Sequence, residues 1–297
     1  MRNIKIEKPI IFIGTGRSGT TVISEIIMRH RDIAFPSGYQ RIFPKNPKIN
    51  LLRNIYDNPF WRIYGQKKQL NKVSLINKFI FRQSEAYDMW EYLTGDDVDF
   101  LRGFLINQRA SEERIHFIHN YFARMIRYQG RKRLAVKITG PSRMEYLLSI
   151  FPEAYFVIIN RKPIPTISSL LKADFWKNKG CGQLWWTGAY SEEEKKWADK
   201  HKDNPVLLTA FQIKKVLEMT QQECDKCKPN YLDINYEDFV NQPEEEIIKI
   251  LNFLNLDIDN ACLDYFKKNK VYSRNKPETE YFSKEQLTEI YKIFNHK

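Results

Sequence analysis

The sequence predicts an α/β fold in which a central parallel sheet lies between two layers of helices, with a helical insertion. Two kinds of pattern predict this three-layer α/β/α arrangement. Short runs of almost uninterrupted apolar residues, as at 10–13 and 154–160, are typical of parallel strands buried on both faces. Segments with apolar residues at helical spacing follow these runs. Such alternation of strand and helix predicts parallel strands joined by helical crossovers.

The first strand and the loop after it predict an anion-binding site. Residues 10–13 read Ile-Ile-Phe-Ile, residues 14–21 read Gly-Thr-Gly-Arg-Ser-Gly-Thr-Thr, and a helical pattern covers residues 20–30. In such a unit, glycines let backbone N–H groups approach an anion, and the helix N-terminus adds partial positive charge. The expected fold is therefore P-loop-like. The alternative is a glycine-rich turn that only connects strand and helix.

The loop differs from a nucleotide-hydrolysing P-loop at one position. Gly14 and Gly19 have the G-x-x-x-x-G spacing, but Thr20 stands where that motif has lysine, and Thr21 holds the Ser/Thr position. The lysine contacts the β- and γ-phosphates in nucleoside triphosphatases, so its absence argues against ATP or GTP hydrolysis. Arg17, inside the loop, supplies a cation instead.

The loop resembles the phosphosulfate-binding loop of sulfotransferases that use 3′-phosphoadenosine 5′-phosphosulfate (PAPS) and release 3′,5′-adenosine bisphosphate (PAP). Arg17 takes the place of the lysine found in the cytosolic branch, as in the bacterial and Golgi-type branches. The resemblance implies that this loop holds the phosphosulfate and that Arg17 is catalytic. The loop residues so implied are Thr15, Gly16, Arg17, Ser18, Gly19, Thr20 and Thr21.

Residues 30–39 resemble the second-strand region of several sulfotransferase branches, which carry a glutamate soon after an H-P-D motif. In the tyrosylprotein branch that glutamate is the catalytic base. Here the corresponding place lies near Ser37, Gly38 and Tyr39 and holds no acid. The resemblance therefore leaves the base unidentified at this position.

Residues from about 43 to 133 are basic and rich in aromatic residues, with helical patterns at 73–81 and 111–128. We expect a helical insertion that lies over the ligand edge of the sheet and shapes the acceptor site, because variable segments at that edge usually bind the second substrate. Ordinary helix packing is the alternative. An acidic patch here either supplies a base or balances nearby Lys and Arg. Its members are Asp88, Glu91, Asp96, Asp97 and Asp99.

Residues 134–139 and 154–160 are expected to be two further buried strands. The block VKITGP…FPEAYFVIINRKP…S is similar to the K-T-x-x-P…FP-x-A…R-(N/D)-P…S region of the sulfotransferases. The resemblance implies that Arg161 and Ser169 hold the 3′-phosphate. An arginine at the carboxyl end of a strand can donate two hydrogen bonds to a phosphate, and a serine on the following helix adds a hydroxyl donor. A surface salt bridge is the alternative for Arg161.

Lys137 aligns with the lysine of the same block, which helps to neutralise the transferring sulfonate in the family, so the resemblance implies a catalytic role. A buried structural lysine is the alternative. The cytosolic branch has its catalytic histidine two residues later, where this chain has Thr139. The second familiar base position therefore also lacks a base.

The C-terminal part predicts a fourth strand with its exit at 230–239, followed by a helix that begins at Pro243. This block resembles the YEDF/L…P…I…I..FL.L segment of the family, which implies that Tyr236 contacts the adenine; a core tyrosine is the alternative. Related enzymes close a basic loop over the 3′-phosphate near this end. Arg274 and Lys276 are the candidates, and a solvated basic loop is the alternative.

Composition narrows the classes of function. The chain has 297 residues, 42% of them hydrophobic, and a net charge of +12, which favours anionic ligands, nucleic acid or acidic surfaces.

The lone C-x-x-C at 224–227 has no second pair, so we expect no metal site. The N-terminus has no apolar signal region and no stretch approaches about 20 apolar residues, so we expect a cytoplasmic protein without a membrane span.

Together these features predict one sulfotransferase domain over residues 1–297, with Arg17 and Lys137 as catalytic residues and PAPS as donor. The acceptor is a hydroxyl or amine of a carbohydrate, lipid, peptide or small molecule. Two alternatives stay open. One is a P-loop kinase or other nucleotide-binding enzyme that depends on magnesium, and the other is a polyanion-binding module. Since no nucleic-acid motif is present, we do not expect nucleic acid as a partner.

Overall fold

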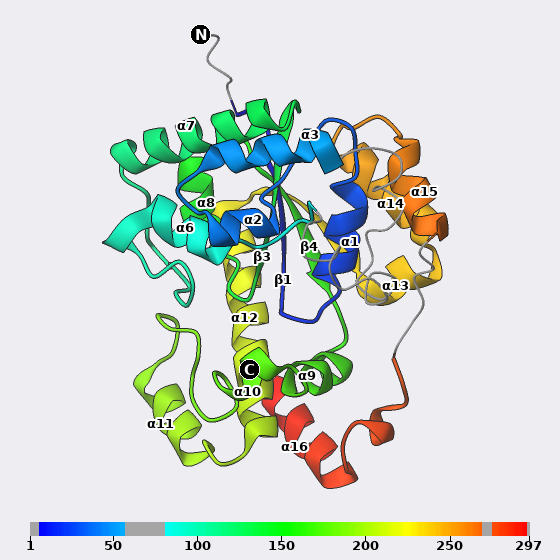
Figure 1. Cartoon of the computed structure of the whole chain (residues 1–297). Coiled ribbons are helices and arrows are strands. Elements are labelled where there is room, and N and C mark those ends of the chain that lie inside the picture. Colours follow the sequence, from blue (N-terminus) through cyan, green and yellow to red (C-terminus); the bar gives the residue numbers. More distant parts are fainter. Residues whose placement is uncertain (1–5, 57–80, 269–274, 296–297) are drawn as a thin grey trace.

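The computed structural model describes residues 6–56, 81–268 and 275–295. Within these residues, five parallel strands form a sheet in the order β2-β3-β1-β4-β5, with β1 (Ile10–Gly14) at its centre (Figure 1). The carboxyl ends of parallel strands meet at one edge, where α/β proteins bind ligands. The remaining strands are β2 (Ile33–Ala34), β3 (Arg133–Thr139), β4 (Tyr155–Asn160) and β5 (Asn230–Asn235).

Helices cover both faces of the sheet. Side chains of successive strand residues point to opposite faces, so Phe12 packs with α1 (Thr20–Ile27), whereas Ile11 and Ile13 pack with α7 (Glu112–Tyr128). The predicted P-loop-like three-layer fold is therefore confirmed. Besides α1, one face carries α13 (Tyr236–Asn241), α14 (Pro243–Phe253) and α15 (Asn260–Lys268), and besides α7 the other carries α6 (Tyr87–Thr94) and α8 (Met144–Ile150).

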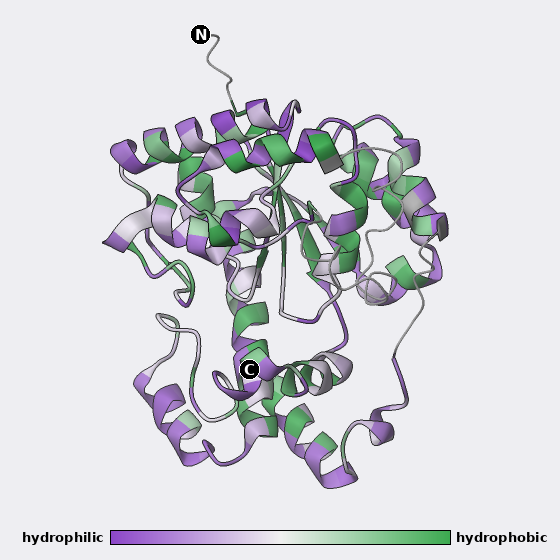
Figure 2. Cartoon of the chain, in the orientation of Figure 1, coloured by the Kyte–Doolittle hydropathy of each residue, from purple (hydrophilic) through white to green (hydrophobic). Residues whose placement is uncertain are grey.

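A third hydrophobic cluster lies beyond the ligand edge of the sheet. The long helix α12 (Pro205–Cys227) joins it to the sheet, because Ile213 and Val216 belong to this cluster while Cys224 packs with the α7 face. Figure 2 shows apolar residues along the strands and a largely hydrophilic α11 at the rim of the third cluster. The other helices of this region are α9 (Pro163–Leu171), α10 (Asp174–Lys177), α11 (Glu192–Lys200) and α16 (Lys284–Asn295).

The insertion packs differently from the expectation. The helix predicted at 111–128 is confirmed as α7, and Ser111 caps it by accepting a hydrogen bond from the backbone N–H of Arg114. Helix α7 buries Phe122 and Met125 against a face of the sheet, so the expectation that the insertion lies over the ligand edge is wrong for this helix. The short helices α2 (Gly38–Ile42) and α3 (Leu52–Tyr56) precede it. The helical pattern at 73–81 lies, apart from its last residue, outside the described residues.

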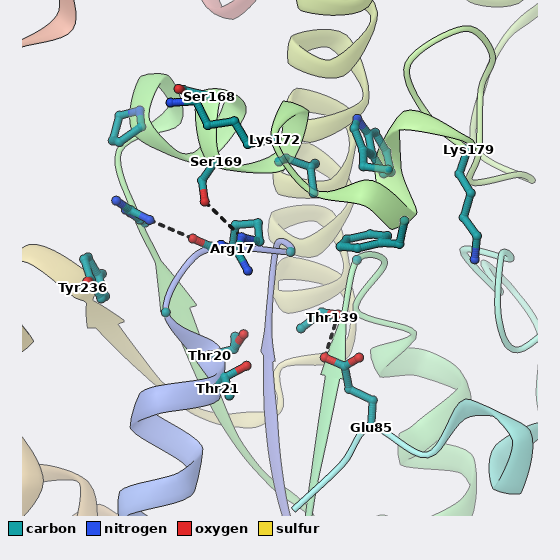
Figure 3. A pocket seen from close by; sticks show the side chains of 18 of the residues that line it. Arg17, Thr20, Thr21, Glu85, Thr139, Ser168, Ser169, Lys172, Lys179 and Tyr236 are labelled. Carbon is teal, nitrogen blue, oxygen red and sulfur yellow. Dashed lines mark hydrogen bonds between the residues drawn. The ribbon is translucent and has the colours of Figure 1, made fainter. Parts of the chain in front are cut away.

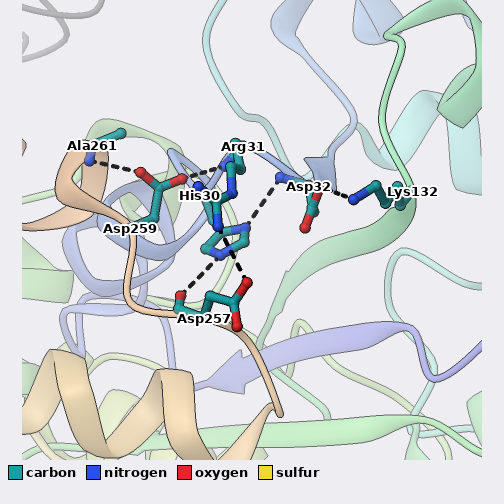
Figure 4. Close-up of polar contacts among 7 residues, drawn as sticks. All are labelled: His30, Arg31, Asp32, Lys132, Asp257, Asp259 and Ala261. Atoms are coloured by element: carbon teal, nitrogen blue, oxygen red, sulfur yellow. Dashed lines mark hydrogen bonds and ion pairs between the residues drawn. The ribbon is translucent and has the colours of Figure 1, made fainter.

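A buried polar cluster ties the chain before β2 to the loop before α15 (Figure 4). His30 is fully buried, and its Nδ1 accepts a hydrogen bond from the backbone N–H of Asp32 at 3.1 Å. Its Nε2 lies 3.1 Å from the carbonyl oxygen of Asp257, so Nε2 carries the proton. The backbone N–H of Arg31 donates to Asp259 at 2.7 Å. These contacts fix the end of the first crossover against the C-terminal helices.

We expect His30→Ala to lower the free energy of unfolding by about 2–3 kcal/mol, because it opens a cavity and removes two buried hydrogen bonds. Urea denaturation measures this change. Lys132→Ala is the control, since it removes only the exposed ion pair of Lys132 with Asp32 at 3.0 Å, which contributes little. Equal losses in the two variants would contradict a structural role for the buried histidine.

No helix in the described part of the chain is both long enough and apolar enough to span a membrane. The interpretation of residues 1–297 as a single domain stays a prediction.

Candidate functional site

A cavity of about 710 Å³ lies at the carboxyl edge of the sheet. The strand register explains its place, because Gly14 at the end of β1 pairs with Thr139 of β3, and Ile13 pairs with Ile158 of β4. The loops that follow these three strands therefore begin side by side. The predicted site residues that line the cavity are Gly16, Arg17, Gly19, Thr20, Thr21, Arg161, Ser169, Tyr236 and Lys276.

The loop after β1 has a conformation suited to close approach by an anion. Gly19 has φ +96° and caps α1, and Arg17 has φ +73°, in the left-handed region that non-glycine residues seldom adopt. Left-handed residues within such loops turn backbone N–H groups toward one concave side. A Cβ atom on Gly19 would lie 2.2 Å from the ring of Tyr236, so only glycine fits between this ring and the loop.

Arg161 contacts the backbone of Arg17 in the loop, and Figure 3 shows the Arg17 side chain directed toward Ser169. The guanidinium of Arg161 donates to the carbonyl oxygen of Arg17 at 2.9 Å and to Asn275 at 2.5 Å, and it lies 4.7 Å from the ring centroid of Tyr236. Burial lowers the pKa of Arg161 from its usual value. Nε of Arg17 donates to the hydroxyl of Ser169 on α9 at 2.9 Å. Two loops and one helix thus meet at these side chains.

Lys137 does not line the cavity itself, but its ammonium contacts two residues that do. Its ammonium donates to the hydroxyl of Thr21 at 3.0 Å and forms an ion pair with Glu85 at 3.2 Å. The same Glu85 oxygen accepts a hydrogen bond from the Thr139 hydroxyl at 3.0 Å (Figure 3). The Tyr87 hydroxyl donates to the carbonyl oxygen of Thr139 at 2.6 Å and accepts from its backbone N–H at 3.1 Å. Glu85 and Tyr87 therefore hold the end of β3.

Sequence reasoning missed Glu85 and Tyr87 as cavity residues. No member of the acidic patch named from the sequence lines the cavity. Asp97 instead forms an ion pair with Arg114 at 3.1 Å, and Asp99 accepts a hydrogen bond from the backbone N–H of Arg102. The ion pair of Asp97 favours the second interpretation of the patch, in which it balances nearby basic residues.

The other predicted site residues differ in their relation to the cavity. Thr15 and Ser18 are buried beneath the loop and do not line the cavity. Lys276 lines it, while its ammonium forms an ion pair with Glu280 at 2.8 Å. Arg274 lies outside the described residues.

Aromatic side chains form the wall opposite the loop. Trp176 and Trp186 are buried in the third cluster and also line the cavity. Phe175 is 53% exposed, and the ammonium of Lys179 lies 4.3 Å from the ring centroid of Trp185. In the described ranges, no group of three or more His, Cys, Asp or Glu is placed to hold a metal ion.

A model of the sulfotransferase family matches residues 9–260, which include every strand and the whole loop. The chain belongs to the sulfotransferase family. A search of the curated proteins finds no match. The prediction of a PAPS-dependent sulfotransferase is confirmed by the family, and the class of acceptor is not identified.

Two solved sulfotransferases from mycobacteria share the fold of this sulfotransferase. Sulfotransferase STF9 from Mycobacterium avium is 15% identical with a TM-score of 0.56, and the match covers 97% of this chain and 76% of that one. Sulfotransferase STF1 from Mycobacterium tuberculosis is 14% identical with a TM-score of 0.53, covering 98% and 77%. At these identities the likeness supports the fold alone.

We expect Gly19→Ala in this sulfotransferase to weaken PAP binding about tenfold or more, because the new Cβ meets the Tyr236 ring and Gly19 has a left-handed backbone. Calorimetric titration with PAP measures the loss. Gly38→Ala is the matched control, since a Cβ on Gly38 meets no atom within 4 Å. A Gly19→Ala enzyme that binds PAP normally would show that the loop tolerates this displacement.

Proposed function

We propose that this sulfotransferase holds PAPS in the cavity at the carboxyl edge of the sheet and transfers its sulfonate to an acceptor hydroxyl or amine. One observation carries the proposal. Three adjacent strands, β1, β3 and β4, bring groups suited to anions to one cavity. The loop at 14–21 and Arg161 contribute to its lining, and Lys137 of β3 donates to the lining residue Thr21. PAPS carries about four negative charges, which match this set of cations.

The donor residues divide between two anionic groups. We assign the 5′-phosphosulfate to the backbone N–H groups of the P-loop and to the hydroxyls of Thr20 and Thr21, beside Lys137. We assign the 3′-phosphate to Arg161 and Ser169, since a guanidinium at a strand end and a helical hydroxyl can both donate to it. The contact of Arg17 with Ser169 at 2.9 Å places Arg17 between the two groups.

We assign the adenine to the side of the cavity formed by Tyr236. Its ring packs against Gly19 and the Arg161 guanidinium, and it lines the same cavity as both phosphate sites. A phenol ring can stack on a nucleobase. Lys276 also lines the cavity, where its ammonium is paired with Glu280.

Transfer proceeds by displacement at sulfur. The acceptor atom attacks the sulfur, the bond between sulfur and the bridging oxygen breaks, and that oxygen remains on the 5′-phosphate of PAP. Lys137 and Arg17 stabilise the negative charge that builds on the bridging oxygen. The ammonium of Lys137 is suited to this because its side chain is only 7% exposed and β3 fixes its position.

Calorimetric titration with PAP, AMP and ATP–magnesium tests the proposed donor site. We expect PAP to bind at least about tenfold more tightly than AMP, because AMP lacks the 3′-phosphate that Arg161 and Ser169 bind. Preference for ATP–magnesium would contradict the proposal and favour a kinase. Binding that ignores the 3′-phosphate and falls steeply with salt would favour a polyanion-binding module.

A further inference from the structure

Related enzymes carry a catalytic base near residues 37–39 or at position 139, and this chain has none at either position. The structure places one carboxylate, that of Glu85, beside both positions. Residues 82–84 pair with residues 36–38 in an antiparallel bridge. The backbone N–H of Gly38 donates to the carbonyl oxygen of Arg82 at 2.9 Å. The backbone N–H of Ser84 donates to the carbonyl oxygen of Pro36 at 2.8 Å. Glu85 follows this pairing directly. Its carboxylate crosses to the end of β3 and accepts from the hydroxyl of Thr139 at 3.0 Å.

The two oxygens of the Glu85 carboxylate have different surroundings. Oε1 accepts from the Thr139 hydroxyl and lies 3.2 Å from the ammonium of Lys137. Oε2 accepts no hydrogen bond from the residues that the structure describes. The side chain is 28% exposed and lines the cavity (Figure 3). One oxygen is therefore held in place while the other can accept a proton from a molecule in the cavity.

The other side chains around Lys137 are poorly suited to take a proton. Burial, and next to it the charge of Glu85, raises the pKa of Tyr87, so its hydroxyl stays protonated at neutral pH. Both of its hydrogen-bonding functions are also used by Thr139. Among the described residues that line the cavity there is no histidine and no other carboxylate. Glu85 is thus the one carboxylate that the described lining offers, and no histidine competes with it.

We propose that Glu85 is the general base of the transfer and that the acceptor group is an unactivated hydroxyl, such as an aliphatic alcohol or a sugar hydroxyl. The inference rests on the proposed function. As the acceptor oxygen bonds to sulfur, its proton passes to Oε2 of Glu85. The bond between sulfur and the bridging oxygen breaks, and its electron pair stays on PAP. The products are a sulfate ester, PAP and a protonated Glu85, which then releases its proton to solvent.

An unactivated hydroxyl is the group that gains most from a positioned carboxylate, because it is almost entirely protonated in neutral water. A phenol with a strong electron-withdrawing group ionises without help. The aromatic wall formed by Phe175, Trp185 and Trp186 faces the same cavity and offers apolar surface for the body of an alcohol or sugar. Lys179 and Lys172 lie at the rim, where an acidic substituent on the acceptor would find a cation.

The test compares acceptors that need a base with one that does not. Release of PAP from PAPS is measured for wild type and Glu85→Gln with water, with hexanol and with 4-nitrophenol, slightly above neutral pH. We expect Glu85→Gln to lower turnover with water and hexanol about a hundredfold. Turnover with 4-nitrophenol, already ionised in solution, should change by less than about threefold. Glu91→Gln is the matched control, since Glu91 lies outside the cavity lining and should leave all three rates unchanged.

The outcomes distinguish a failure of the Glu85 assignment from a failure of the proposed donor site. Calorimetry should show that Glu85→Gln binds PAP as wild type does, and Glu85→Asp should recover part of the turnover with hexanol. An equal loss with all three acceptors would overturn the assignment and leave Glu85 as a partner that only positions Lys137. Unchanged turnover with water and hexanol would overturn it as well. Failure of wild type itself to bind PAP would contradict the donor site instead.

Discussion

Arg161→Ala is expected to weaken PAP binding about a hundredfold, the largest loss of affinity for any single residue of the donor site. Removing one partner of a desolvated charge pair costs about 2–5 kcal/mol, and each 1.4 kcal/mol is a factor of ten in affinity. The side chain also donates to the carbonyl oxygen of Arg17 and to Asn275, so an effect through the loop after β1 has to be separated from loss of the 3′-phosphate contact. Calorimetric titration with PAP and AMP measures the effect.

The contrast between the two ligands makes the experiment specific. If Arg161 binds the 3′-phosphate, Arg161→Ala loses affinity for PAP and changes little toward AMP. Arg161→Lys should recover only part of the affinity, because an ammonium cannot donate two parallel hydrogen bonds. Arg124→Ala, on the exposed side of α7, removes the same charge far from the cavity and serves as the control. Equal losses for PAP and AMP would show that Arg161 acts only through loop structure.

Much of this fold could be predicted from local sequence because its central strands carry strong local signals. The apolar runs around Phe12 and Phe156 predict strands buried on both faces, and the structure places both in the middle of the sheet. The P-loop could be recognised because its glycines have a fixed spacing within one short segment. Arg161 and Ser169 follow one strand directly, so their approach to the loop is a consequence of strand order.

Glu85 could not be predicted because its role depends on contacts between distant segments. It reaches β3 only because residues 82–84 pair with residues 36–38, and no periodic pattern in the sequence predicts this pairing. The sequence instead favours the acidic residues at 88–99 as candidates, because several acids close together are unusual in a basic chain. Tyr87 was missed for the same reason, because its two hydrogen bonds join it to Thr139, 52 positions further along the chain.

Lys137→Met is expected to lower turnover about a thousandfold while the affinity for PAP changes by less than about threefold. Removing one preorganised group that stabilises transition-state charge costs about 10²–10³ in turnover, and the low exposure of Lys137 favours the upper end. The measurement uses PAPS with 4-nitrophenol, because this acceptor needs no base. Any loss then reports on the leaving group rather than on Glu85.

The ion pair of Lys137 with Glu85 provides a second test of the same assignment. Lys137→Met alone leaves a partly buried carboxylate without its cation, so the free energy of unfolding should fall by about 1–2 kcal/mol. Combining Lys137→Met with Glu85→Gln removes both charges and should recover most of this stability in urea denaturation. Turnover with 4-nitrophenol should stay as low as in Lys137→Met, because stability does not replace the missing cation. If turnover recovers together with stability, Lys137 is a structural residue and the charge on the leaving oxygen is stabilised by Arg17 and the P-loop alone.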